Sequence, residues 1–144
     1  MKSISSLFMR LAVVWFIAGV TLGLVMAASQ NHSMAPVHAH INLLGWVTMT
    51  LFAAFYRNWP AAAMSPLARW HFWLYVPAHF VQMVTLAMLY AGMKAVEPVL
   101  GAASVVVVLA VVCFAVLVWR ETGAEHAGRT MPGALGEGAV PGPR

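Results

Sequence analysis

The sequence predicts an all-α integral membrane protein, a four-transmembrane-helix bundle with both termini cytoplasmic. Hydrophobic residues make up 62% of the 144 residues and charged residues only 8%, a composition typical of membrane proteins. Four apolar segments are each long enough to cross a bilayer, which takes about 20 helical residues. They cover residues 11–29, 37–56, 70–91 and 98–119. Because backbone polar groups cannot stay unpaired in lipid, we expect one helix in each segment.

The basic residues predict the orientation of these helices. Seven would share one side of the membrane: Lys2, Arg10, Arg57, Arg69, Arg120, Arg129 and Arg144. Only Lys94 falls on the other side, so the side that holds both termini should be cytoplasmic. The net charge of +4 therefore reflects topology, and no nucleic-acid-binding patch is expected. The expected location is a bacterial inner membrane.

The first apolar segment has a competing interpretation as a cleaved signal peptide, because Lys2 and Arg10 precede it and small residues end it. Its apolar stretch is longer than the usual signal core, so we expect a retained helix. Gly19 and Gly23 form a small-xxx-small pair, which lets a second helix approach closely. The pattern leaves open whether that helix belongs to the same chain or to a second copy.

The second and third segments carry histidines, which are costly at membrane depth and normally face a cavity, a partner or a cofactor. They are His38, His40, His71 and His79. His38 and His40 point about 200° apart on a helix, so they must serve different neighbours. His38 shares its face with Asn42, which suits a polar neighbour. His40 shares its face with apolar residues, and an imidazole on an apolar wall suits a haem iron.

The third segment has a polar stripe that should face the bundle interior. His71 lies on it with Tyr75 and Gln82, and His79 is turned somewhat further round. Spacing alone leaves two interpretations open: a bound cofactor, or an interhelical hydrogen-bond network worth about 0.6 kcal/mol per contact. Pro77 should bend this helix, which either re-aims His79 or serves packing alone.

The end of the chain carries fewer signals. Cys113 lies alone in the fourth segment and should behave as a small apolar residue. Residues 123–144 are rich in Gly and Pro, so we expect a disordered cytoplasmic tail after a membrane domain of residues 1–122. No carboxylate lies inside an apolar segment, so a proton pump built on a carboxylate relay is not expected.

Residues 36–80 contain, in order, the motifs His38-Ala39-His40, Trp59-Pro60 and His71-Phe72-Trp73. This stretch resembles subunit I of the haem-copper oxidases, a family that includes cytochrome c oxidases, quinol oxidases and nitric oxide reductases. In that family the first histidine of a His-x-His pair binds the high-spin haem and the second binds the low-spin haem. The resemblance implies haem as the cofactor, with His38 and His40 as ligands. A second, weaker match of residues 40–44 to an earlier family helix also selects His40.

The chain also departs from that family. The family subunit has many more transmembrane helices, and this chain lacks the His-Pro-Glu-Val-Tyr segment and the adjacent His-His pair that supply the family's copper ligands. We therefore expect no oxygen reduction by this chain alone. The family counterpart of His71 is not an iron ligand, so the resemblance does not make it one.

Helix geometry limits which histidines can share a haem. At a rise of 1.5 Å per residue, His40 lies about 5 Å and His79 roughly 18 Å below the outer ends of their helices. Bis-histidine ligation needs two nitrogens about 4 Å apart, so straight, level helices would keep the two apart. A bend at Pro77, a ligand from His32 in the outer loop, or a histidine of a second copy would each resolve this.

The leading hypothesis is a haem b protein of the membrane that carries electrons or senses a gas. Its candidate cofactor-binding residues are His38, His40, Asn42, His71 and His79. The alternative is a copper-handling protein that uses outer-face Met and His side chains; the candidate metal ligands are His32, His38 and His40. A third hypothesis is a cofactor-free assembly subunit. Expected partners are the lipid bilayer, a second copy of the chain, and a redox partner or oxidase subunits.

Overall fold

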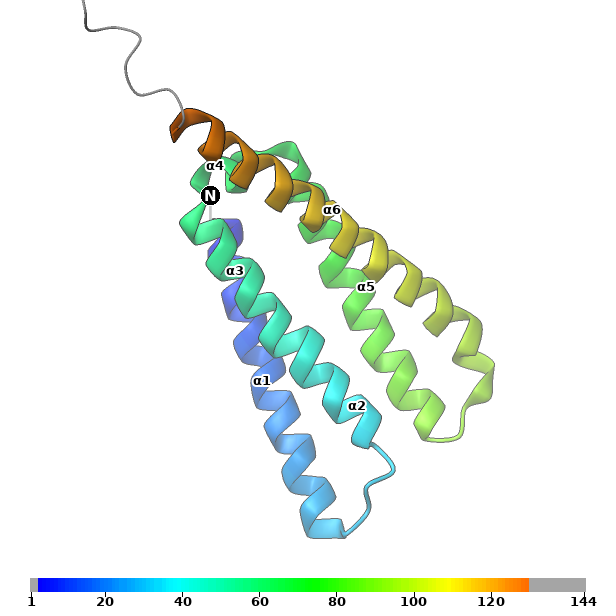
Figure 1. Cartoon of the computed structure of the whole chain (residues 1–144). Coiled ribbons are helices and arrows are strands. Elements are labelled where there is room, and N and C mark those ends of the chain that lie inside the picture. The colour runs from blue at the N-terminus through cyan, green and yellow to red at the C-terminus, as the bar shows by residue number, and fades with distance from the viewer. Residues whose placement is uncertain (1–2, 130–144) are drawn as a thin grey trace, which may run out of the picture.

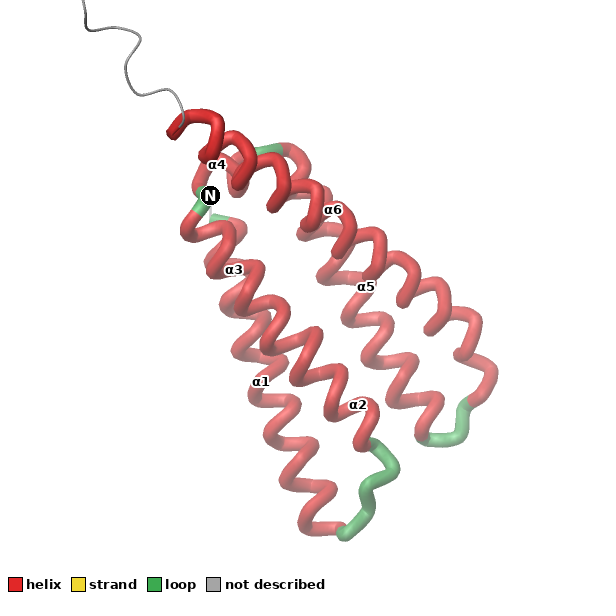
Figure 2. The backbone as a smooth tube through the Cα atoms, viewed as in Figure 1, coloured by secondary structure: helices red, strands yellow, loops and turns green. Residues whose placement is uncertain are grey.

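The computed structural model describes residues 3–129, with side chains described as far as residue 123. Within this range the regular structure is all helical, and short loops and turns join the helices (Figure 2). Four helical spans of the described chain are long and apolar enough to cross a membrane: Ile4–Ser29, Ala35–Asn58, Pro66–Tyr90 and Lys94–Gly123. The prediction of an all-α chain with four such helices is confirmed.

The first span is the single helix α1 (Ile4–Ser29), which begins well before residue 11. The Ser3 hydroxyl accepts a hydrogen bond from the Ser6 N–H at 3.2 Å and caps the helix, because it satisfies one of the first unpaired donors. At the other end Gln30 has a φ of 54°, the left-handed conformation that commonly ends helices. The predicted start at residue 11 was the beginning of the apolar stretch, whereas the helix itself begins after the capping residue Ser3.

The second span consists of three pieces: α2 (Ala35–His40), the π-helix η1 (Ile41–Thr48) and α3 (Met49–Asn58). In a π-helix the hydrogen bonds join residues five apart, so each turn holds more residues than an α-helical turn. The Thr48 hydroxyl follows the same spacing and donates to the Leu43 carbonyl at 2.7 Å. Such segments occur frequently at functional sites, and this one begins directly after His40.

Proline begins both of the next helices, α4 (Pro60–Met64) and α5 (Pro66–Tyr90). Proline is tolerated there because the N–H that it lacks would have no partner within the helix. The Ser65 hydroxyl caps α5 by accepting from the Leu67 N–H at 3.1 Å. Pro77 lies inside α5 and removes the N–H that would bond to the carbonyl of Trp73.

The short 3-10 helix η2 (Lys94–Val96) leads into α6 (Glu97–Arg129). Because α6 continues past residue 122, the predicted start of the disordered tail is corrected: residues 123–129 are helical. Ala and Glu in this stretch favour a helix, and the prediction gave too much weight to the Gly and Pro residues that follow. The rest of the predicted tail lies outside the described residues.

The spans form two hairpins that lie side by side, α1 with the second span and α5 with α6 (Figure 1). The α4 end of the bundle holds α4, the start of α1 and the last turns of α6; the far end holds the loops that follow α1 and α5. Four exposed arginines lie toward the α4 end: Arg10, Arg57, Arg69 and Arg120. Lys94 lies at the far end, so the basic residues are separated along the bundle as the sequence predicts.

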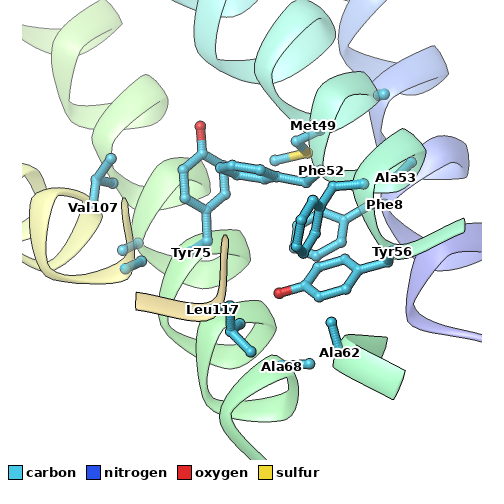
Figure 3. Close-up of a cluster of buried hydrophobic side chains, with 14 residues drawn as sticks. Phe8, Met49, Phe52, Ala53, Tyr56, Ala62, Ala68, Tyr75, Val107 and Leu117 are labelled. Carbon is cyan, nitrogen blue, oxygen red and sulfur yellow. The ribbon is translucent and has the colours of Figure 1, made fainter. Parts of the chain in front are cut away.

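Aromatic rings join the two hairpins in the half of the bundle nearer the α4 end (Figure 3). The fully buried Phe8 of α1 has its ring centroid 5.4 Å from that of Phe52 in α3 and 5.1 Å from that of Phe72 in α5. Phe114 of α6 lies 4.5 Å from Phe52. All four spans therefore share one buried core.

Candidate functional site

His38 and Asn42 pack against α1. The His38 ring donates through Nδ1 to the carbonyl of Gly19 at 3.0 Å, and the Asn42 amide donates to the His38 carbonyl at 2.8 Å. A Cβ added at Gly19 would lie 2.6 Å from the Asn42 amide group, and one at Gly23 would lie 2.9 Å from the His38 ring. The small pair in α1 therefore admits polar side chains of the second span, which answers the question left open by the sequence in favour of packing within the chain.

His40 is half-buried, and its ring is held in one orientation. Its Nδ1 lies 2.8 Å from the carbonyl oxygen of Pro36. Because a carbonyl only accepts, Nδ1 must carry the proton, which leaves Nε2 of the neutral ring with an available lone pair. Histidines that bind metals usually have this arrangement, in which a hydrogen bond at one nitrogen orients the other toward the metal.

His79 lies wholly buried between aromatic side chains. Its ring centroid is 4.9 Å from that of Trp15 in α1 and 5.8 Å from that of Tyr75, with the Tyr75 ring stacked on it. Neither ring nitrogen has a hydrogen-bond partner in bonding geometry, although Gln82 lies close enough to interact with His79. The Gln82 amide nitrogen donates to the hydroxyl of Ser104 at 3.0 Å, and its oxygen also lacks a partner.

The far ends of the helices are not level, which changes the separation expected for His40 and His79. Met83 of α5 shares a buried cluster with Val37 and Ile41 of the second span, so the start of α2 lies level with a point well inside α5. Because the second span and α5 run in opposite directions, His79 lies about 6 Å from Met83 toward the α4 end, while His40 lies between the levels of Val37 and Ile41. Their axial offset is therefore roughly 2–8 Å.

His71 belongs to a different part of the bundle. It shares a hydrogen bond of 2.8 Å with the Tyr56 hydroxyl through Nδ1, and its ring centroid lies 4.4 Å from that of Phe52. Its Nε2 has no partner. Eight residues separate His71 from His79 on one helix, which places them about 12 Å apart along the axis. His71 is thus part of the aromatic core and is not brought together with His40.

His32 lies exposed in the loop between α1 and α2. Among the described residues, no group of three or more His, Cys, Asp or Glu side chains is placed to hold a metal ion. His38 is engaged with α1, so the three predicted metal ligands do not form one cluster. The candidate site that remains is the buried ring of His79 with Trp15 and Tyr75 around it, together with the oriented ring of His40 on the neighbouring span.

Sequence reasoning missed two components of this site. Trp15 appeared only as one apolar residue of the first segment, yet it contacts His79. The Pro36 carbonyl is a backbone group, so no residue type in the sequence marks it as a partner of His40. Its position four residues before His40 could have indicated the contact, because residues at that spacing adjoin on a helix. Trp15 offered no local signal, since its contact depends on how the hairpins pack.

Trp15 packs directly against Gly45 and also contacts His79. A larger residue at position 45 should therefore destabilise the protein. In Gly45→Ala the new Cβ would lie 2.6 Å from Cγ and 2.7 Å from Cβ of Trp15, so α1 must move. We expect a loss of about 1–3 kcal/mol in unfolding free energy, measured by titrating the purified protein from mild detergent into denaturing detergent. Gly101→Ala is the control, because nothing lies within 4 Å of its added Cβ. Equal effects of the two changes would contradict the close approach.

No protein-family model, curated protein or solved structure matches the chain. The resemblance of residues 36–80 to oxidase subunit I therefore stays a prediction from the sequence.

Proposed function

We propose that the protein is a membrane-embedded haem b protein that carries electrons, with His40 and His79 as the residues that would hold the iron. The observation that carries this proposal is the buried ring of His79, whose two nitrogens both lack a hydrogen-bond partner. A buried polar group without a partner costs about 1–3 kcal/mol. A bond to a metal centre would remove that cost at one nitrogen.

His40 supplies the second half of the proposed ligand pair. Its hydrogen bond to the Pro36 carbonyl fixes the tautomer and presents Nε2, and the unequal helix ends reduce its axial offset from His79. Iron held by two imidazoles in haem favours electron transfer, whereas an open position would favour gas binding. The resemblance to oxidase subunit I independently selects His40.

Trp15 and Tyr75 define what the protein contributes around the proposed haem. Both rings contact His79, so they exclude water from the ligand and hold its ring in place. Entry of a porphyrin requires at least one of these rings to turn away. Two cavities of about 340 and 350 Å³ lie along α5, and no histidine lines either one, so neither is the proposed haem site.

The proposed orientation places the α4 end in the cytoplasm of a bacterium, with the chain in the inner membrane. The arginines gathered at that end support this, because basic residues near helix ends favour the cytoplasmic side. The proposed partners are a redox protein that delivers or accepts electrons, or oxidase subunits, and a second copy of the chain.

Copper handling is less well supported. It relied on His32, His38 and His40 acting together, and His38 is directed toward α1 through its bond to Gly19. A cofactor-free assembly subunit would explain the hydrogen bonds of His38 and His71, but it leaves the nitrogens of His79 without a function.

The proposal is tested by a reduced-minus-oxidised absorption spectrum of the detergent-purified protein, produced with haem supplied during expression. We expect sharp b-type absorption bands and a ratio close to one haem per protein chain. Elemental analysis of the same sample distinguishes the alternatives. Copper at a similar ratio with no haem bands would favour the copper-handling alternative, and a colourless, metal-free protein would favour the assembly subunit.

A further inference from the structure

Two cavities meet along one face of α5. The first, of about 340 Å³, is lined by Pro66, Arg69, Trp70 and Trp73. The second, of about 350 Å³, is an open groove that runs from Trp73 along Pro77 and Val81 and is lined on its other side by α6. Trp73 lines both, so the cavities adjoin. Each has a volume within the usual range of small-ligand sites.

The first cavity has the chemistry of a headgroup site. Arg69 offers a guanidinium that matches the oxygens of a phosphate, and among the described side chains no carboxylate forms an ion pair with it. Trp70 and Trp73 are 65% and 69% exposed, and their indole N–H groups suit the headgroup level of a bilayer. The arginines at the α4 end add a favourable field for a negative charge.

The second cavity has the chemistry of an acyl-chain groove. Its floor includes the buried Ala78 of α5 and Ala103 of α6, whose small side chains leave room between the helices. Its walls include exposed apolar side chains, such as Val81 and Val99. From Trp73 to Val81 the groove extends about 12 Å along the helix, from the headgroup cavity toward the middle of the bundle.

We infer that this surface binds one anionic phospholipid, with its phosphate at Arg69 and one acyl chain in the groove between α5 and α6. A cavity that holds one basic residue, joined end to end with a wholly apolar groove, matches the two chemically different halves of such a lipid. The inference needs the chain to lie in a membrane but does not depend on the proposed haem, because neither His40 nor His79 lines these cavities.

Native mass spectrometry of the full chain in detergent, titrated with phosphatidylglycerol or phosphatidylcholine of identical acyl chains, tests the inference. We expect the anionic lipid to bind about tenfold more tightly. Arg69→Gln should remove most of that preference, whereas Arg57→Gln, at another exposed arginine near the α4 end, should keep it. Ala102→Leu should weaken the binding of both lipids about tenfold, because the larger side chain fills the groove. Ala54→Leu, on the exposed face of α3, should leave the binding of both lipids unchanged.

Each arm can overturn the inference separately. Equal affinity for the two lipids would show that the cavity does not select an anion. Equal losses in Arg69→Gln and Arg57→Gln would show only a general attraction to a basic surface. Unchanged binding in Ala102→Leu would show that the acyl chain does not occupy the groove. If the unmodified protein showed no haem bands but still preferred the anionic lipid, only the proposed function would be contradicted, and the lipid inference would stand.

Discussion

Replacing His79 by leucine should abolish haem binding and at the same time stabilise the haem-free protein. Haem binding should disappear because the substitution removes one of the two residues that would hold the iron. Stability should rise by about 1–3 kcal/mol because leucine brings no unpaired polar atoms into a site that is fully buried. Absorption spectra report the first effect, and unfolding of the haem-free protein in denaturing detergent reports the second.

The two readouts separate a ligand from a packing residue. His40→Ala should also remove the b-type bands, with little change in the stability of the haem-free protein because His40 is only half-buried. His32→Ala is the control, since His32 lies exposed in a loop, and its spectrum should match that of the unmodified protein. A stabilised His79→Leu protein that still binds one haem with unchanged bands would exclude His79 as a ligand.

Truncation of Phe8 should have the largest effect on folding. Phe8 is fully buried and contacts rings from α3 and α5, so Phe8→Ala leaves a cavity at the junction of the hairpins. We expect unfolding to become easier by about 3–5 kcal/mol, measured by detergent titration.

Phe80→Ala is the matched comparison for this change. Phe80 lies on α5 with 58% of its surface exposed, so its removal leaves no enclosed cavity and should cost less than about 1 kcal/mol. Similar losses for the two substitutions would mean that the rings around Phe8 do not hold the hairpins together.

The number and position of the helices could be predicted because apolar length is a local property of the sequence. The helix ends were harder to place, because they depend on single groups such as the hydroxyl of Ser3 and on the helix propensity of residues 123–129. The π-helix was not predicted. No residue type in Ile41–Thr48 marks it, and it depends on how the span packs.

The candidate site could be predicted only in part. The cost of a polar group in lipid pointed to the histidines, and the opposite directions of His38 and His40 predicted different neighbours for the two rings. In the structure His38 bonds to Gly19 of α1, and His40 bonds to the Pro36 carbonyl of its own helix. The proposed pairing of His40 with His79 could not be derived, because it depends on the unequal helix ends, which only the packing of Met83 against α2 reveals. For the same reason, the sequence could not show that His71 joins the aromatic core.

The π-helix η1 allows the two halves of the second span to be aimed independently. An added or missing residue in an α-helix turns everything before it by about 100° relative to everything after it. Because η1 takes up extra residues between His40 and α3, the direction of the histidine can change while Phe52 keeps its place in the aromatic core. A one-residue change in the length of this segment would therefore re-aim the proposed ligand without rebuilding the bundle.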